Sequence, residues 1–340
     1  MPLQLLPFAD SHLDEAAQLL ADRHRADRAR DPMLPAAFAD PAATREVLTA
    51  IRAEPGSGVV ALQAGRLVGY LLAVYRTPAP TTAQAWLMRP RAAVVRYPCH
   101  AADPADAAEI YRALYAALSA QWVAAGYFNH YVTIPATDPG AAEAWASLGF
   151  GRDLTYAVRD TRPLAAPAPA PGLTIRLATP ADLETLYALT EGLFRHHTAA
   201  PVYWPFLPEL EGDTRAHNEQ AIANPANACW VAYLDGAPVG LQWLEQRTGG
   251  GIDVSLPESS IYLNLGYTHP RLRGSGVGTA LLARALAWAH EAGYAHCTLH
   301  YAAANLLGAR FWQRSGFRAL SHRLHRAVDE RIAWARAPGD

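Results

Sequence analysis

The sequence has few cysteines, no long apolar run and no excess of basic residues. Three cysteines, Cys99, Cys229 and Cys297, are scattered over 340 residues and form neither a C-x-x-C metal pair nor a disulfide framework. No apolar stretch approaches the roughly 20 residues that span a bilayer, and the N-terminus has no signal-peptide pattern. A net charge of −2 offers no basic surface for nucleic acid. We therefore expect a cytoplasmic protein without a metal site and without a membrane or nucleic-acid partner.

The composition and length predict two folded domains. Hydrophobic residues make up 51% of the chain and charged residues 18%, which excludes general disorder. Residues 159–171, RDTRPLAAPAPAP, read as a proline/alanine linker, because alternating prolines favour an extended spacer. This linker divides the chain into domains at residues 1–158 and 172–340.

The two domains carry the same sequence pattern. Leu173–Leu189 matches Leu3–Leu19, and Val231–Leu244 matches Val60–Ala73, both at an offset of about 170 residues. The pattern of each half predicts mixed strands with helices between them, which is typical of an α/β or α+β layered fold. For the first half we expect a strand to Phe8, helices past Leu20 and over Pro41–Ala53, a hairpin of Val59–Leu62 and Leu67–Tyr75, one or two strands within Trp86–Tyr97, a helix over Ala105–Ala125, a strand at Tyr131–Ile134, a helix over Pro139–Ser147 and a final strand after Phe150.

The second half contains a strand, a glycine-rich turn and a helix in succession. Tyr262–Thr268 reads as a strand, Pro270 ends it, and Thr279–Glu291 has helical periodicity. The turn between them contains Arg271, Arg273, Gly274, Gly276 and Gly278. Unpaired N–H groups at a helix start attract an anion, and arginines add charge-assisted hydrogen bonds, so this arrangement predicts a phosphate site. The turn fits neither the G-x-G-x-x-G dinucleotide fingerprint nor a P-loop.

Two segments carry a resemblance to a known family. Arg271, Gly274 and Gly276 fill the pattern [QR]-x-x-G-x-[GA], which resembles the pyrophosphate-binding segment of the GNAT superfamily of acyl-CoA N-acyltransferases. A second segment follows a strand at Ala295–Tyr301 and resembles N-x-x-[AG]-x-x-[FLIV]-[YW]-x-x-x-G-F, filled by Asn305, Gly308, Phe311, Trp312, Gly316 and Phe317.

The resemblance implies two tandem domains, each with a mixed, mostly antiparallel central sheet flanked by helices. It also implies a splayed strand pair that holds acetyl-CoA as co-substrate in the second domain. The cofactor-binding residues implied are Thr268, Arg271, Arg273, Gly274, Ser275, Gly276, Val277, Gly278, Thr279, Asn305, Arg310 and Trp312.

The first half differs at the corresponding turn. Tyr97–Glu109 contains no glycine and carries Asp103, Asp106 and Glu109. Acids at a helix N-terminus satisfy the helix dipole and repel a pyrophosphate, so we expect that this half has lost acyl-CoA binding. Its role is either structural or a direct share in substrate binding.

Residues for proton transfer are less clearly marked. The candidates are Tyr262 and Asn264 on the strand before the loop, Glu245 at the end of a hairpin strand, and His300 on the neighbouring strand. Trp312 stands where the family often has an acidic tyrosine, but an indole N–H does not yield its proton. Candidates for substrate binding are His196, His197, Tyr203 and Trp204, in the region between the first two helices of the second half.

The function that the resemblance implies is acetyl transfer from acetyl-CoA to a primary amine, by direct attack in a ternary complex. The acceptor partner is a small molecule or a peptide, and the protein is either a monomer or a homodimer. Three alternatives remain open: a non-catalytic acyl-CoA sensor, an enzyme that transfers a longer acyl chain, and an interaction scaffold.

Overall fold

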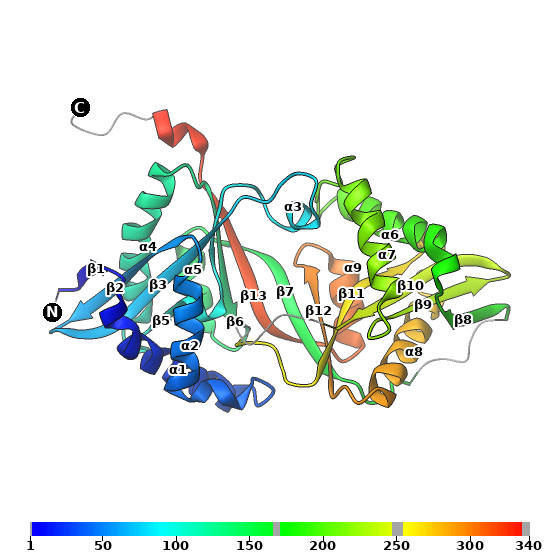
Figure 1. The fold of residues 1–340 in the computed structure, drawn as a ribbon, viewed down its shortest axis with the longest axis horizontal. Coiled ribbons are helices and arrows are strands. Elements are labelled where there is room, and N and C mark those ends of the chain that lie inside the picture. The colour runs from blue at the N-terminus through cyan, green and yellow to red at the C-terminus, as the bar shows by residue number, and fades with distance from the viewer. Residues whose placement is uncertain (1, 166–170, 247–253, 335–340) are drawn as a thin grey trace.

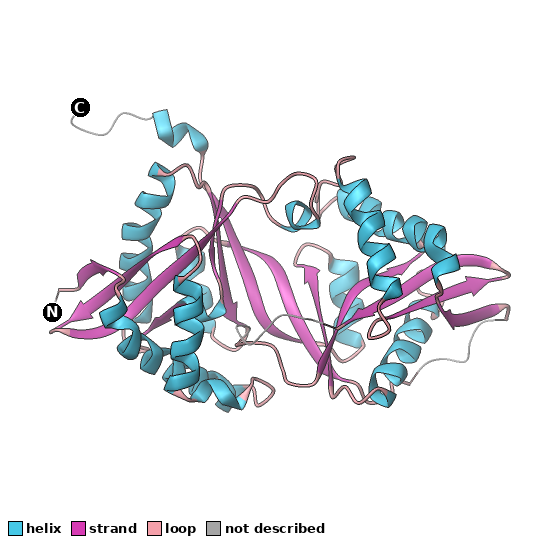
Figure 2. Ribbon diagram, in the orientation of Figure 1, coloured by secondary structure: helices cyan, strands magenta, loops and turns pink. Residues whose placement is uncertain are grey.

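The computed structural model describes residues 2–165, 171–246 and 254–334. These residues form one mixed sheet of thirteen strands, with helices on both faces (Figures 1 and 2). The strand order is β1-β2-β3-β4-β6-β13-β7-β12-β11-β10-β9-β8, with β5 paired to β3. None of the described helices is long and apolar enough to cross a membrane.

The two halves contain their elements in the same order, except that the helix Ala83–Leu87 and the strand His100–Ala102 of the first half have no counterpart among the described residues of the second half. The first half comprises β1 (Gln4–Pro7), α1 (Leu13–Arg30), α2 (Pro41–Arg52), β2 (Gly56–Gln63), β3 (Arg66–Arg76), α3 (Ala83–Leu87), β4 (Ala92–Val95), β5 (His100–Ala102), α4 (Ala107–Ala124), β6 (Asn129–Pro135), α5 (Pro139–Ser147) and β7 (Gly151–Asp160). The second half comprises β8 (Leu173–Leu177), α6 (Leu183–Thr198), α7 (Leu210–Ala223), β9 (Ala228–Leu234), β10 (Ala237–Glu245), β11 (Ser260–Thr268), α8 (Val277–Glu291), β12 (His296–Ala302), α9 (Leu306–Arg314) and β13 (Arg318–Ala327).

Pairing is also equivalent in the two halves. β3 and β4 are antiparallel, as are β10 and β11, whereas β4–β6 and β11–β12 are the parallel pairs. The predicted fold class, a layered α/β fold repeated in tandem, is therefore confirmed.

Local sequence signals explain several boundaries. Asp138 caps α5 by accepting from the N–H of Ala141, and Pro139 occupies the first turn, so the helix has the bounds predicted. The prediction of one or two strands within Trp86–Tyr97 is confirmed by a single strand. Trp86 lies in the short helix α3, and only Ala92–Val95 forms a strand.

The last strands of the two halves are exchanged. β13 lies between β6 and β7 and is antiparallel to both, while β7 pairs with β12. Figure 1 shows β13 and β7 crossing the centre of the molecule. β7 continues through Asp160, two residues into the predicted linker, and residues 166–170 of that linker lie outside the described residues. The division into domains at residues 158 and 172 remains a prediction.

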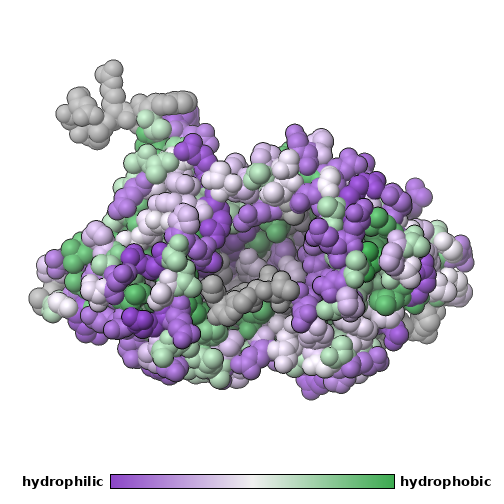
Figure 3. Space-filling model, in the orientation of Figure 1, coloured by the Kyte–Doolittle hydropathy of each residue, from purple (hydrophilic) through white to green (hydrophobic). Residues whose placement is uncertain are grey.

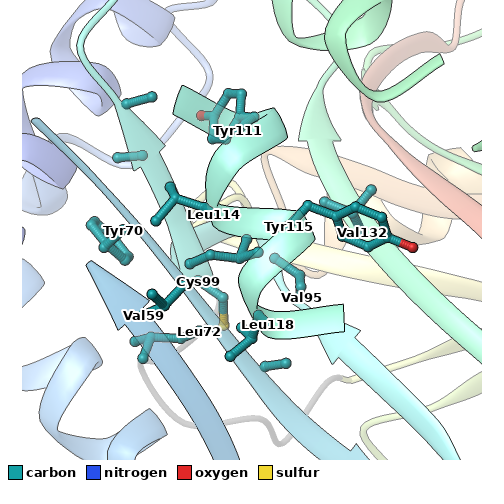
Figure 4. Close-up of a cluster of buried hydrophobic side chains, with 14 of the residues drawn as sticks. Val59, Tyr70, Leu72, Val95, Cys99, Tyr111, Leu114, Tyr115, Leu118 and Val132 are labelled. Carbon is teal, nitrogen blue, oxygen red and sulfur yellow. The ribbon is translucent and has the colours of Figure 1, made fainter. Parts of the chain in front are cut away.

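Each half has its own apolar core. Figure 4 shows the first core, in which Leu114 and Leu118 of α4 pack on Tyr70 and Leu72 of β3. In the second half, Leu281 and other residues of α8 cover one sheet face, and residues of α6 cover the other. The part of the sheet that belongs to the second half is thus covered on both faces. It opens between β11 and β12.

Candidate active site

β11 and β12 separate soon after they begin to pair. Their parallel register covers only Ser260–Tyr262 against His296–Thr298. In the pairing of β11 with β10, Trp243 faces Leu265 and Leu244 faces Leu263, so Asn264 is an extra residue on β11. Such a bulge bends a strand and redirects its side chains. Leu263 accordingly packs in the α8 core and Leu265 in the α6 core. The predicted splayed strand pair is present.

The opening between these strands is part of a cavity of about 860 Å³. Residues of β11, β12, α6, α7, α8 and α9 line it. Its volume lies within the range of small-molecule and cofactor sites. Figure 3 shows that this face of the molecule is hollowed between its two halves.

The start of α8 has no side-chain cap. Gly276 is the N-cap residue, with a φ of 91°, and Gly274 has a φ of 80°. Both values lie in the left-handed region that favours glycine. The first turn of α8 contains no acidic residue. By contrast, the side chain of Asn305 caps α9 by accepting from the N–H of Gly308. The first N–H groups of α8 are therefore available to an anion.

The arginines of this loop have no carboxylate partner among the described residues. Arg271 and Arg273 are exposed, and the only side-chain hydrogen bond described for either runs from Arg273 Nε to the Thr268 carbonyl at 3.4 Å. A Cβ on Gly278 would lie 3.1 Å from Thr268 Oγ1, so a side chain there would crowd the end of β11. Backbone N–H groups and free guanidinium groups together form a site for a phosphate.

Most of the predicted cofactor residues line the cavity. Those that do are Thr268, Arg273, Gly274, Gly276, Gly278, Thr279, Asn305, Arg310 and Trp312. Arg271 and Ser275 are exposed outside its lining, and Val277 is buried in the core beneath α8. Trp312 is buried, and a Cβ on Gly266 would lie 2.9 Å from its ring. This indole therefore closes the floor below β11.

The opposite end of the cavity lies between α6 and α7. Thr190, Phe194 and His197 line it from α6 at helical spacing, and His217 and Asn218 line it from α7. The short helix α3 of the first half adds two further lining residues, Trp86 and Leu87. Figure 1 shows α3 next to α6 and α7.

His197 orders this end of the cavity. Its Nδ1 lies 3.0 Å from the Leu193 carbonyl and donates to it, so Nε2 is left to accept from Asn305 Nδ2 at 3.5 Å. Burial lowers the pKa of His197 to about 4, helped by His196 and Arg273, and keeps its ring neutral. The ring stacks on Trp204 at 5.2 Å.

The other predicted substrate residues are divided. His196 and Trp204 line the cavity, whereas Tyr203 is 70% exposed and does not. Burial, then the charge of Arg273, lowers the pKa of His196.

The four predicted catalytic residues fall into two groups. Tyr262 contacts His300 through its hydroxyl and the ring Nδ1, and the two rings stack. Glu245 Oε1 lies 3.0 Å from His217 Nε2, and Asn264 Nδ2 lies 3.3 Å from the same nitrogen. The hydrogen bond that His217 donates to Glu245 raises the pKa of His217. His217 lines the cavity and Glu245 does not, so the histidine stands between the carboxylate and the cavity.

Sequence reasoning missed Trp86, His217 and Asn218. The spacing of Thr214, Asn218 and Ala221 in α7 does mark one buried face, and its two polar members were the available signal. Trp86 gave no such signal, because it belongs to the other half of the chain.

Comparisons with known proteins bear on this site. Residues 192–317 match the model of the family described as the acetyltransferase (GNAT) family. No curated protein matches the chain in sequence.

Several solved structures resemble the whole chain. A GCN5-related N-acetyltransferase from Sphaerobacter thermophilus has a TM-score of 0.62 at 16% identity, over 96% of this chain and 95% of that one. A GCN5-related glucosamine N-acetyltransferase region of a fungal multi-domain β-N-acetylglucosaminidase has a TM-score of 0.54 at 14% identity, over 95% of this chain and 38% of that one. A tandem GNAT protein of the clavulanic acid pathway, 19% identical over both full chains, has a TM-score of 0.49. At these identities, the first two likenesses concern the fold alone.

Proposed function

We propose that this chain belongs to the GNAT family, whose model matches residues 192–317, and that it transfers an acetyl group from acetyl-CoA to a primary amine. The observation that carries the proposal is the uncapped glycine start of α8, which opens onto a cavity that continues between β11 and β12 to α6 and α7. One end of this cavity suits a pyrophosphate and the other suits a small acceptor. Direct attack in a ternary complex is the reaction that a single continuous cavity favours.

The α8 loop supplies the anion-binding end. Backbone N–H groups from Gly276 onward and the guanidinium of Arg273 would hold the pyrophosphate of acetyl-CoA, which brings the reactive thioester. Each charge-assisted hydrogen bond of this kind contributes about 1.5–3 kcal/mol. The side chain of Asn305, held by His197, would contact the pantetheine arm where it passes between β11 and β12.

His217 is the residue that best suits the role of general base. A neutral amine must lose a proton once it has attacked the thioester, and a histidine titrates near the working pH. With Nε2 donating to Glu245, the Nδ1 of His217 is left as the proton acceptor. Glu245, which sequence reasoning proposed as a base, then stabilises the charged imidazolium.

Thermal unfolding with and without acetyl-CoA tests the first step. A ligand at about a hundred times its dissociation constant adds about 2.7 kcal/mol to the stability of the protein that binds it. We expect a clear upward shift of the midpoint for the wild type, and little or none for Arg273→Glu. Arg112→Glu on α4, the first-half counterpart of α8, is the matched control, because Arg112 is exposed and pairs only with Glu109.

The outcomes separate the alternatives. No shift in the wild type rejects acyl-CoA binding and favours an interaction scaffold. A shift that Arg273→Glu retains places the pyrophosphate elsewhere and contradicts the proposal. A shift without thiol release in the presence of any amine indicates a sensor.

A further inference from the structure

Besides the indole N–H of Trp86, the acceptor end of the cavity contains two buried polar side chains that lack hydrogen-bond partners among the described residues. Asn218 of α7 is 0% exposed, and neither its Oδ1 nor its Nδ2 is paired. Thr190 of α6 is 1% exposed, and its Oγ1 is unpaired. Both residues line the cavity. Leaving buried amide and hydroxyl groups unpaired is unfavourable, so the pair marks a place where a ligand supplies the missing partners.

The neighbouring Thr214 shows that a polar side chain on one of these helices can find a hydrogen-bond partner within the protein. Thr214 lies one turn before Asn218 and also lines the cavity. Its hydroxyl donates to the Leu210 carbonyl at 2.8 Å, the usual local bond of a buried threonine in a helix. Thr190 makes no such bond, so its hydroxyl remains available to a ligand.

The chemistry of Asn218 restricts the group that fits. Its carboxamide offers one acceptor oxygen and two donor hydrogens, and both ends need partners. A hydroxyl or a carboxamide on the ligand can both donate and accept. A carboxylate only accepts and would leave Oδ1 of Asn218 unpaired, and a second ammonium only donates and would leave Nδ2 unpaired.

The local charge points the same way. Asn218 directly follows His217, whose partner is Glu245, and Asp213 also raises the pKa of His217 by its charge. Neither carboxylate lines the cavity, but both lie close enough to His217 to act on it by their charge, so their field disfavours an anionic group at this end. His217 and Asn218 line the cavity from the same turn of α7, so we expect the ligand's polar group to lie only a few bonds from the amine that His217 deprotonates.

We propose that Thr190 and Asn218 form a subsite for an uncharged hydrogen-bonding group, a hydroxyl or a carboxamide, on the amine acceptor. This inference rests on the proposed function and specifies its acceptor class. Amino alcohols and amino amides are substrates, and short amino acids and simple alkylamines are poor ones.

Four short amines test this directly with acetyl-CoA and the wild-type protein. They are 3-amino-1-propanol, β-alaninamide, β-alanine and propylamine, and kcat/KM is measured by thiol release. We expect either or both of the first two to exceed the last two by roughly ten- to a hundredfold, because their polar group completes the buried hydrogen bonds. The ratio between the first two tells a hydroxyl from a carboxamide. Equal values for all four overturn the inference.

Asn218→Leu provides the second arm. We expect it to abolish the preference among the four amines while the unfolding midpoint without ligand stays the same or rises, because an unpaired buried amide is replaced by an apolar group of similar size. Gln220→Leu, which removes an exposed amide from the same helix, is the control and should change neither quantity. A retained preference in Asn218→Leu overturns the inference, whatever the stability.

A second variant and a parallel binding measurement separate a failure of this inference from a failure to fold or to bind acetyl-CoA. If Asn218→Leu does not fold, Thr190→Val removes only the unpaired hydroxyl and should reduce the same preference. The acetyl-CoA shift in thermal unfolding is measured in parallel. A normal shift with no amine preference rejects this inference alone, and no shift in the wild type rejects the proposed function together with it.

Discussion

The gap between two equivalent strands is open in the second half of the molecule and filled by side chains in the first half. In the second half, β11 and β12 diverge and leave a cavity. In the first half, Arg23 of α1 fills the corresponding gap. Its guanidinium donates to the carbonyls of Tyr97, at 2.8 Å, and of His100, and its side chain is only 10% exposed. His100 then reaches across to β6, with Nε2 donating to the Thr133 carbonyl at 3.0 Å. One half thus satisfies its strand edges with its own side chains, and the other leaves them for a ligand.

The loops that precede the equivalent helices differ in the same sense. Before α4, Asp103 accepts from the N–H of Ala105 at 3.1 Å and pairs with Arg66. Before α8, glycines and unpaired arginines leave the N–H groups free of carboxylates. The acids before α4 would repel a pyrophosphate, and Arg23 occupies the place that a pantetheine arm would need. The expectation that the first half does not bind acyl-CoA therefore has a physical basis in both the loop and the core, and it remains a prediction.

Removing the filling residue should give the largest effect. Arg23→Met leaves the carbonyls of Tyr97 and His100 unpaired, and it leaves Asp27, which is 1% exposed, with Arg30 as its remaining cation. We expect a loss of about 3–5 kcal/mol in the free energy of unfolding, measured with urea. Arg25→Met, on the exposed side of the same helix, should change it by less than about 0.5 kcal/mol. Equal stability of the two variants would mean that Arg23 does not hold the gap closed.

Acid should destabilise the first half through its buried histidines. Burial, with Arg23 next, lowers the pKa of His100 to about 3, and burial lowers that of His130 to about 4. Because both folded pKa values lie below the unfolded value, the stability that depends on the two neutral rings is fully present above about pH 6.5 and is lost as the pH falls. The two histidines together should lower the free energy of unfolding by about 3 kcal/mol between pH 6.5 and pH 5.

NMR titration of the folded protein checks the cause. The ring signals of His100 and His130 should stay constant from pH 8 to pH 5, while that of His217, whose pKa is raised by Glu245, should shift with pH. Titration of His100 near its ordinary pKa would show that its environment is polar, against the comparison drawn above.

A smaller effect should come from the one place where the first half contributes to the open cavity. Trp86 contacts Phe194, His197 and Trp204, with ring centroids 4.5, 5.5 and 5.1 Å away. Trp86→Leu should raise the KM for the acceptor about tenfold and leave the acetyl-CoA shift unchanged, because only the acceptor end loses an aromatic wall. Tyr203→Leu, which changes an exposed aromatic nearby, is the control. Equal KM values for both variants would restrict the first half to a structural role.

The smallest effect concerns the proton acceptor. Glu245→Gln removes the carboxylate whose hydrogen bond raises the pKa of His217, so that pKa should fall toward its ordinary value. The rising limb of the pH–rate profile should then move to lower pH, by roughly one unit or less, because the histidine is partly exposed. An unchanged limb would mean that another group accepts the proton.

Sequence patterns predicted the elements and the anion loop better than the acceptor end. Glycine and arginine at fixed positions between a strand and a helix have a local physical meaning, so Gly274, Gly276 and Arg273 could be recognised directly. Arg23 could not be told from any other arginine on an amphipathic helix, because the local sequence does not show that its side chain donates to the distant carbonyls of Tyr97 and His100. His217 and Asn218 sit in a polar helix that resembles a surface helix until Trp86 and α6 cover it. The exchange of β7 and β13 could not be predicted either, since alternating apolar and polar residues identify a strand but not the strand that it pairs with.

That exchange has a consequence for how the protein is made. β13 completes the pairing of β6, yet it is synthesised some 190 residues later. The first half therefore keeps an open strand edge until the second half has been synthesised. Contacts of such high sequence separation slow folding and expose unpaired edges to aggregation. The duplicated fold thus behaves as one cooperative unit, and neither copy can be detached without leaving the other's sheet incomplete.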